Sequence, residues 1–404
     1  MIIIISNNIT LASQSSAQVL PISSPLSPTM ATGTKADGKI VEGEFRYDAL
    51  RDLQTSNNYQ LAVCSENCTS VTPKVMYDAS TNIFIGFSTP LDHGVSVTQF
   101  FQTDSYDQLK EWFENEEKSN LLNVHMLELL TISKSSSTSF LLGAYRITSK
   151  FNSIDVLRRW LWIFERSRIS NIRILAFSAD CDPKYLRAMR LITGFFAKLP
   201  NIPISERNDV LEQSIETNAW ISKTDVYPKD RQNFGSCAKI STDDVLFPLN
   251  NVSDSYATQV YLRLLRSIII AYIEKSASII DRIYHSWMTV FICRLWWTGL
   301  QLTDEEKIST EHQDKNKAFF FITKAAYHSI EINAHTLLSV VILVCQHDLP
   351  ESALCISSFN SQTCENVFRL TRSMPGTFSS NVNFTVGQFL RRAGKLSVLQ
   401  DIER

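Results

Sequence analysis

Short apolar runs separated by polar turns dominate the first half of the chain. Residues 59–66 (YQLAVCSE), 71–78 (VTPKVMYD) and 82–89 (NIFIGFST) are rich in Val, Ile, Phe and Tyr. Runs of this kind are typical of β-strands joined by short loops, so we expect an antiparallel meander. Residues 139–147 (SFLLGAYRI) predict a fourth strand. The continuous apolar run 172–180 (IRILAFSAD) predicts a fifth strand inside a sheet.

Several stretches of the chain show the periodicity of α-helices. A charged helix is expected near 108–120, and 153–168 (SIDVLRRWLWIFERSR) is amphipathic, with Ser153 as its expected N-cap and Asp155 in its first turn. Strand signals nearly stop after residue 183. Two long helical regions follow, at 257–300 and 315–347, and a charged connector lies between them.

The order of three antiparallel strands, a fourth strand, a helix and a fifth strand predicts an α/β fold of the ribonuclease-H-like class. That fold is a mixed sheet with helices on its faces, here with a large all-helical insertion before the last helix. We expect a disordered tail rich in Ser, Thr and Pro at 1–43 and the first part of the core at 44–190. The helical insertion is expected at 191–349, and a C-terminal helix and tail that complete the core at 350–404.

Composition narrows the class of protein. The 404 residues carry a net charge of −2, so overall charge gives no reason to expect nucleic-acid binding, and any such surface must be local. The eight cysteines include no CxxC pair, which favours reduced thiols inside a cell. The apolar start MIIII is short for a signal peptide, and no uncharged stretch reaches membrane-spanning length. We therefore expect a nuclear or cytoplasmic protein that is neither secreted nor membrane-bound.

Carboxylates at the ends of predicted elements are the candidates for chemistry. Asp180 and Asp182 follow the fifth strand, and Glu365 lies at the start of a predicted late helix. Near the first strand the chain offers Glu66 and Asn67. Oxygen ligands of this kind suit Mg²⁺ or Mn²⁺. The alternative is that an aspartate in Asp-x-Asp-Pro caps the next helix and that Glu365 is an ordinary exposed helix residue.

Several longer stretches resemble P-element-like (THAP-type) DNA transposases. They are SENCTSVTPKVMYDASTNIFIGFSTPLD, FSADCDPKYLRAMR, TDVYPKDRQNFGSCAKI, DRIYHSWMTVFICRLWW and NSQTCENVFRLTRSMPGTFSSNVNFTVGQFLRRAGKL, at 65–92, 177–190, 224–240, 281–297 and 360–396. The resemblance runs in the same order from about residue 44 to 403. It implies that the family's catalytic carboxylates fall on Asn67, Asp180 and Glu365. In the family, two Mg²⁺ or Mn²⁺ ions bound there support DNA cleavage and strand transfer.

Departures from the family pattern change the expected function. Asn67 is neutral where the family has an aspartate, so catalysis should fall by orders of magnitude. The neighbouring Glu66 cannot replace it, because successive strand residues point to opposite faces. Cys181 stands in place of a glycine. The chain also lacks the cysteine and histidine pattern of the family's N-terminal zinc-binding domain.

Other residues have structural readings beside functional ones. Trp287, Trp296 and Trp297 are expected in a helical core, with base stacking as the alternative. We expect the three histidines of the second helical region to pack or to face solvent, without a carboxylate at ligand spacing: His328, His335 and His347. A group of basic residues near the C-terminus has two interpretations: a solvent-exposed charged face, which is the usual one, or a surface that binds phosphates weakly. Its members are Arg369, Arg372, Arg391, Arg392 and Lys395.

Three functional hypotheses remain open. The first is a transposase-derived protein whose metal-dependent strand cleavage is impaired, with Asp180 and Glu365 holding what metal remains. The second is a non-catalytic interaction or DNA-binding protein that acts through the helical block, with a second copy or an intact transposase as partner. The third is a helical protein unrelated to transposases, for which Asn67, Asp180 and Glu365 should lie far apart.

Overall fold

The computed structural model describes residues 2–4, 39–57, 59–118, 120–130, 137–180, 182–193, 241, 256–302, 321–374 and 383–402. The chain divides into two compact units, Met1–Met189 with Pro350–Arg404, and Arg190–Leu349. The first unit is thus assembled from two segments that are far apart in the sequence.

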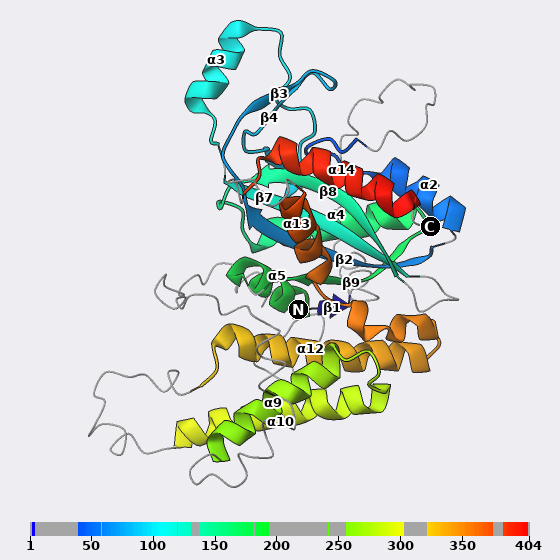
Figure 1. The fold of residues 1–404 in the computed structure, drawn as a ribbon. Coiled ribbons are helices and arrows are strands. Elements are labelled where there is room, and N and C mark those ends of the chain that lie inside the picture. The colour runs from blue at the N-terminus through cyan, green and yellow to red at the C-terminus, as the bar shows by residue number, and fades with distance from the viewer. Residues whose placement is uncertain are drawn as a thin grey trace, which may run out of the picture. The chain divides into compact units, whose positions relative to one another are not determined.

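A five-stranded mixed sheet forms the centre of the first unit (Figure 1). Its order is β1–β9–β2–β7–β8, in which β2 runs parallel to β9 and all other neighbours are antiparallel. The strands are β1 (Ile2–Ile4), β2 (Leu61–Ser70), β7 (Leu121–Leu130), β8 (Ser137–Ile147) and β9 (Arg173–Ala179). The mixed sheet expected from the sequence is confirmed.

The expected meander is wrong in two of its three strands. The runs at 71–78 and 82–89 form a separate hairpin, β3 (Met76–Asp78) and β4 (Ile83–Ile85), instead of joining the main sheet. The strand that follows β2 in the main sheet is β7, which the apolar pattern did not reveal. Asn123 and His125 stand at fully buried positions in β7 and interrupt the apolar run that an interior strand normally shows.

The hairpin and α3 (Tyr106–Asn115) form a small lobe, in which α3 lies close to the charged helix expected near 108–120. The short strands β5 (Leu91–Asp92) and β6 (Val95–Ser96) pair with each other, and β6 contacts the helix Ser153–Ile169. Phe87, Phe101 and Trp112 form a separate apolar cluster in this part of the chain. The lobe therefore has its own small core.

Helices cover both faces of the main sheet (Figure 1). α4 (Ser153–Ile169) and α5 (Pro183–Thr193) contact the side chains of Glu66 and Cys68 in β2. α13 (Gln362–Ser373) contacts Ser65 and Asn67 instead. Alternate residues of one strand thus meet different helical layers, as the pleat requires. α14 (Val386–Ile402) packs with α13 on β8, and α2 (Tyr47–Asn57) lies near the same strand.

The start of α4 differs by one residue from the expectation. Its N-cap is Asn152, not Ser153, because the Asn152 side chain accepts hydrogen bonds from the backbone N–H groups of Ile154 and Asp155. The Asp155 carboxylate accepts in return from the Asn152 backbone N–H, which completes a capping box. The place of Asp155 in the first turn is as expected.

Parts of the segment expected to be a disordered tail over 1–43 are placed. Ile2–Ile4 pair antiparallel with residues Ala176 to Ser178 of β9, and Ile40 is buried in the apolar core with residues of α13 and α14. Residues 5–38 lie outside the described part of the chain, so the prediction for them stands as a prediction.

The described part of the second unit is helical. It contains α9 (Tyr256–Tyr272), α10 (Ile279–Leu302) and α12 (Lys324–Cys345), within the two regions expected to be helical. Arg282 of α10 is buried and donates hydrogen bonds to the backbone oxygens of Ala271 and Glu274, at the end of α9. After α12 the chain returns to the first unit through two short 3-10 helices, Glu351–Leu354 and Ile356–Ser358.

One described helix, α12, is long and apolar enough to cross a membrane by length and composition alone. We expected no uncharged stretch of that length, and α12 meets the criterion with Lys324 and Glu331 in its sequence. Glu331 is buried and paired with Arg294 of α10. Core helices of water-soluble proteins meet the same criterion, so it does not distinguish the two environments.

Candidate functional site

Two of the expected site residues touch across the middle of the first unit. The side-chain Nδ2 of Asn67, in β2, donates a hydrogen bond of 2.7 Å to Oε1 of Glu365, in the first turn of α13. Asn67 is 3% exposed, whereas Glu365 is exposed. Residues that lie 298 positions apart in the sequence therefore meet at one point of the sheet.

Further contacts align α13 along the same edge of β2. Ser65 Oγ lies 3.4 Å from Cys364 Sγ, and Thr69 Oγ1 accepts a hydrogen bond of 2.6 Å from Arg372. Ser65, Asn67 and Thr69 are alternate residues, so all three side chains point to the α13 face. The contact between Asn67 and Glu365 is one of a row that sets how the helix lies on the strand.

Asp180 lies at the same end of the sheet. It directly follows Ala179, the last residue of β9, and Ala179 pairs with Glu66 of the parallel strand β2. The backbones of Asp180 and Asn67 are therefore the next positions along two neighbouring strands. Burial raises the pKa of the Asp180 carboxyl, and the negative charges of Asp182 and Glu66 add to this rise.

Asp182 has the capping role that the sequence suggested. Its Oδ1 accepts a hydrogen bond of 2.8 Å from the backbone N–H of Lys184, in the first turn of α5, and Pro183 is the first residue of that helix. The Asp180 side chain instead accepts from the backbone N–H of Asp182 at 3.0 Å, within the turn. The two aspartates thus have different tasks. Cys181, between them, lies outside the described residues.

Glu66 faces the opposite layer and is fully buried. Both of its carboxylate oxygens accept hydrogen bonds from side chains of β7, α4 and α5: Asn123 (2.7 Å), Arg159 (2.5 Å), Trp160 (2.6 Å) and Tyr185 (3.0 Å). His125 Nε2 lies 3.4 Å from the same carboxylate. This confirms the expectation that Glu66 cannot take the place of Asn67.

Charge balance keeps Glu66 ionised. Burial alone would raise the pKa of its carboxyl, but the Arg159 guanidinium, His125 and their hydrogen bonds oppose this and hold that pKa far below its usual range. Burial lowers the pKa of His125, so the ring is neutral near pH 7. The buried charges are therefore one carboxylate and one guanidinium, joined in an ion pair.

The residues at the Asn67 end of the sheet do not fit a site for two divalent cations. They offer two carboxylates, Asp180 and Glu365, and one neutral amide. Within the described ranges, no group of three His, Cys, Asp or Glu side chains is arranged to hold a metal ion. Glu365 Oε1 accepts a hydrogen bond from the side-chain N–H group of Asn67. The Asn67 amide thus takes up one acceptor position of the Glu365 carboxylate.

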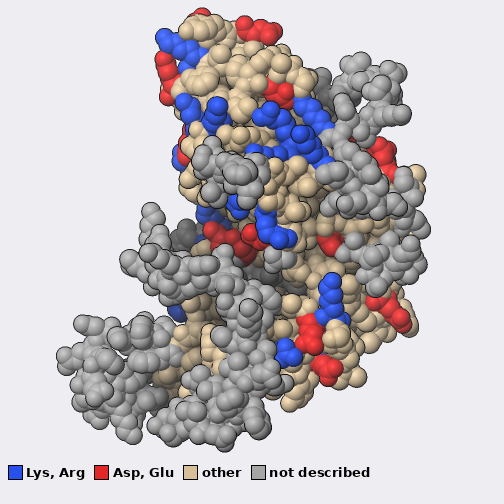
Figure 2. Space-filling view, in the orientation of Figure 1, with Lys and Arg blue, Asp and Glu red and all other residues tan. Residues whose placement is uncertain are grey.

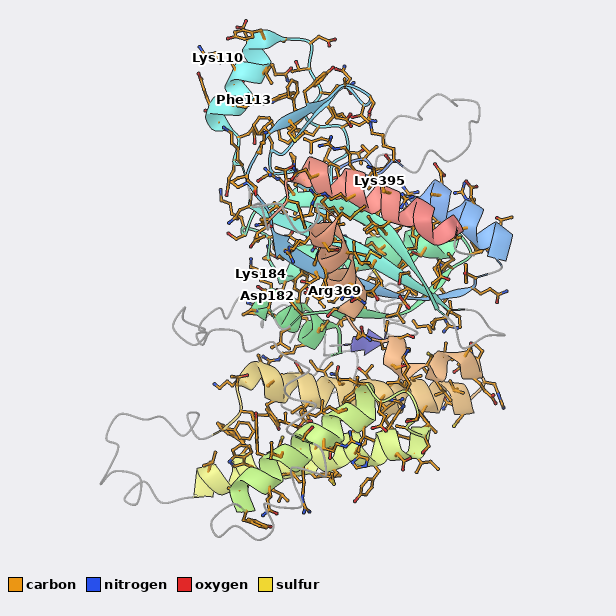
Figure 3. All side chains as sticks on the ribbon, viewed as in Figure 1. Lys110, Phe113, Asp182, Lys184, Arg369 and Lys395 are labelled. Atoms are coloured by element: carbon orange, nitrogen blue, oxygen red, sulfur yellow. The ribbon has the colours of Figure 1, made fainter. Side chains whose placement is uncertain are left out.

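The basic group near the C-terminus is partly used in packing. Arg372 donates to Thr69, and Arg392 donates to the backbone oxygen of Thr371 at 2.9 Å. On the face drawn in Figure 2, Lys and Arg side chains gather over α14, and Asp and Glu side chains gather near the start of α5. Arg369 and Lys395 are exposed on α13 and α14 (Figure 3), so they remain available to an anion.

The aromatic and histidine residues of the second unit pack within it. Trp287 lies against His335, and Trp296 and Trp297 lie against Phe321, but all three tryptophans are half-buried and not in the buried core that was expected. The expectation that no carboxylate stands at helical spacing from the histidines is wrong. Glu331 precedes His335 by four residues, and its Oε2 lies 3.8 Å from His335 Nε2.

The Glu331 carboxylate also receives two hydrogen bonds from Arg294, of 2.6 and 2.7 Å. Sequence reasoning overlooked this pair because its members lie 37 residues apart on different helices. Burial, followed by the positive charge of Arg190, lowers the pKa of His328 to about 4.

No protein-family model matches the chain, and no curated protein matches it. A solved structure is similar: the Drosophila P element transposase strand transfer complex, with a TM-score of 0.49 and 10% sequence identity. The match covers 89% of this chain and 82% of the transposase chain.

Proposed function

We propose that the chain derives from a P-element-like DNA transposase with a ribonuclease-H-like core, and that its metal-dependent strand cleavage is impaired. In this proposal Asn67, Asp180 and Glu365 are the descendants of the three catalytic carboxylates. The replacement of the first carboxylate by an amide is the cause of the impairment.

The sheet of the first unit supports the proposed core. Strands β2, β7 and β8 form an antiparallel series, and β9 lies parallel to β2 on its other side. This order is the one expected of a ribonuclease-H-like core. The division into Met1–Met189 with Pro350–Arg404 and Arg190–Leu349 agrees with a helical insertion before the last helices.

The hydrogen bond between Asn67 and Glu365 carries the proposal. Among 404 residues, an unrelated helical protein has no reason to bring these two positions into contact, and here they lie 2.7 Å apart. Since Asp180 follows the residue that pairs with Glu66, it is at the same end of the sheet. The neighbouring backbone positions of Asn67 and Asp180 and the contact between Asn67 and Glu365 support a common origin of the three residues.

A plasmid-nicking assay with Mn²⁺ tests the impairment. The wild-type protein should leave supercoiled DNA intact, whereas Asn67→Asp should nick it, because the substitution restores the missing charge. Asn67→Asp combined with Asp180→Ala should be inactive again. Efficient cleavage by the wild-type protein, unaffected by Asp180→Ala, would contradict the proposal.

Metal binding gives a second readout, since other departures from the family could also prevent cleavage. The Asn67→Asp variant should bind Mn²⁺ at least tenfold more tightly than the wild-type protein in a calorimetric titration, because a carboxylate binds a hard cation better than an amide does. The gain should vanish when Glu365→Gln is added. An unchanged Mn²⁺ affinity in Asn67→Asp would show that these residues do not share a site.

A second candidate function is a non-catalytic interaction or DNA-binding protein that acts through its helical unit. The donor set at Asn67 favours it, because a neutral amide that donates to Glu365 is a poorer partner for a divalent cation than a carboxylate. Failure of Asn67→Asp both to cleave DNA and to gain Mn²⁺ affinity would favour this candidate over a repairable nuclease.

A further inference from the structure

Helix α10 exposes several large apolar side chains, beside the exposed residues Arg294 and Thr298. Four large apolar side chains point to solvent: Ile280 (75% exposed), Tyr284 (63%), Phe291 (52%) and Leu295 (72%). In contrast, the buried side of the helix contains several polar residues, Arg282, Ser286 and Thr289 among them. A surface helix normally shows the opposite distribution. Something outside the described helices of this unit is therefore expected to cover the exposed side.

The exposed residues form one continuous stripe. They are spaced by four, seven and four positions, and Trp287 lies between Tyr284 and Phe291 at the same helical periodicity. At 100° per residue, this stripe lies opposite the buried residues Arg282, Ser286, Thr289 and Cys293. We call Ile280, Tyr284, Trp287, Phe291 and Leu295 the α10 stripe.

The neighbours of α10 leave the stripe uncovered. α9 and α12 pack against α10 (Figure 1), and Trp287 at the margin of the stripe touches His335 of α12. The other four side chains stay exposed in the presence of both helices. An additional helix fits this position. Apolar residues spaced alternately by three and four positions are the pattern by which one helix packs against another.

We propose that the α10 stripe binds the α10 stripe of a second copy of this chain, in antiparallel orientation. The stripe is symmetric about a point between Trp287 and Met288. Residues 280 and 295 are equally far from that point, and so are residues 284 and 291. A two-fold axis there sets Ile280 opposite Leu295 and Tyr284 opposite Phe291, so the surface complements itself as a closed dimer requires.

The available area suits a weak dimer. The exposed fractions of the four residues correspond to roughly 500 Å² of surface on each copy, and a pair would bury about twice that area. This total lies near the lower limit for specific protein interfaces. The roughly 500 Å² on each copy lies within the range of about 300–600 Å² for the largest apolar patch of a typical monomer, a patch that is often functional. The proposal gives the second candidate function a partner and is independent of any nuclease activity.

Analytical ultracentrifugation of the full chain tests the dimer. The wild-type protein should associate reversibly at micromolar concentrations, and Leu295→Glu should weaken association at least 100-fold, because each dimer would bury two added charges. Ile169→Glu is the matched control, since Ile169 is 65% exposed at the end of α4 in the first unit, and it should leave association unchanged.

Two results would overturn the dimer. One is a wild-type protein that remains monomeric at 100 µM. The other is a Leu295→Glu variant that associates like the wild-type protein. A monomer whose melting temperature falls in Leu295→Glu and not in Ile169→Glu would show that the stripe is covered within one chain, which also excludes the proposal.

Cysteine cross-linking tests the orientation. In a background carrying Cys345→Ser, which removes an exposed native thiol, chains with Tyr284→Cys are mixed with chains carrying Phe291→Cys. The antiparallel dimer should give mixed disulfides, because these positions face each other. It should give few disulfides between identical chains, since position 284 lies about 10 Å from its own copy along the axis. Disulfides mainly between identical chains would contradict the antiparallel arrangement.

Discussion

At the scale of single residues, Asn67 differs from the aspartate that the resemblance implies by one group: an amide NH₂ replaces a carboxylate oxygen. The amide nitrogen of Asn67 donates to Glu365 at 2.7 Å, where an aspartate would present a second negative charge to the same oxygen. Two carboxylates at that distance repel each other unless a cation or a proton lies between them. The amide therefore stabilises the contact between β2 and α13 without a bound ion.

The neighbouring residue Glu66 leads to a stability prediction. Glu66→Gln should lower the free energy of unfolding by about 3–5 kcal/mol, because it leaves the buried Arg159 guanidinium without its counter-charge. Denaturant unfolding measures this change. The exposed Glu165→Gln on α4 is the control and should change stability by less than about 0.5 kcal/mol.

A double variant separates the ion pair from packing. Glu66→Gln with Arg159→Met removes both charges, so it should cost less than the sum of the two single variants. If the double variant loses as much unfolding free energy as the two single variants together, the two side chains do not interact.

At the scale of elements, the sequence predicted best where local signals and packing agree. The strand ending at Ala179, the cap at Asp182 and the helix bearing Glu365 all follow from neighbouring residues. The strand β7 could not be found in this way. Its polar residues Asn123 and His125 are buried because they lie against Glu66, which is a contact between strands that no local pattern contains.

The site could be predicted only in part for the same reason. The resemblance placed Asn67 and Glu365 in a common site, but apolar periodicity cannot show which atoms meet. The direction of the hydrogen bond, from the amide to the carboxylate, depends on how α13 lies along β2. That position is set by Ser65, Cys364 and Arg372 in contacts that span about 300 residues.

The cap of α5 gives a prediction about an element. Asp182→Ala should lower the free energy of unfolding by about 1 kcal/mol, because the backbone N–H of Lys184 loses its acceptor at the start of the helix. Asp182→Asn keeps an acceptor oxygen and should stay within a few tenths of the wild-type value. Thermal unfolding of both variants provides the measurement. Equal losses in the two would show that charge, and not the cap, matters there.

At the scale of the whole first unit, Glu42 joins the small lobe to the main sheet. Its carboxylate accepts hydrogen bonds from the backbone N–H groups of Gly86, next to β4, and Arg146, in β8. The Arg146 side chain donates to the backbone oxygens of Gly86 and Thr72. Burial raises the pKa of the Glu42 carboxyl to about 7, although the Arg146 charge and both hydrogen bonds oppose the rise.

This pKa predicts a pH dependence of stability. The folded state holds the Glu42 proton more tightly than the unfolded state, whose pKa is near 4.5. The stabilisation that comes from the protonated Glu42 carboxyl is complete below about pH 4.5 and is lost as pH rises to about 7. The free energy of unfolding should fall by about 3 kcal/mol over this range.

Unfolding free energies of the wild-type protein and Glu42→Gln, measured from pH 4.5 to 8, check this. The wild-type value should fall relative to the variant over that range and then level off. A difference that stays constant with pH would contradict the assignment.

The division of the first unit into two sequence segments has a consequence for synthesis. While the ribosome is still translating Arg190–Leu349, the sheet has no α13 or α14 to cover one of its faces, and Val124 and Met126 lack the apolar partners that these helices supply, such as Phe368 and Phe389. Nascent chains therefore expose an aggregation-prone apolar face of the sheet for the time needed to add about 160 residues, on the order of 10 s or more. Chains released before Pro350–Arg404 should aggregate, and full-length chains should depend on chaperones that shield that face until the last helices arrive.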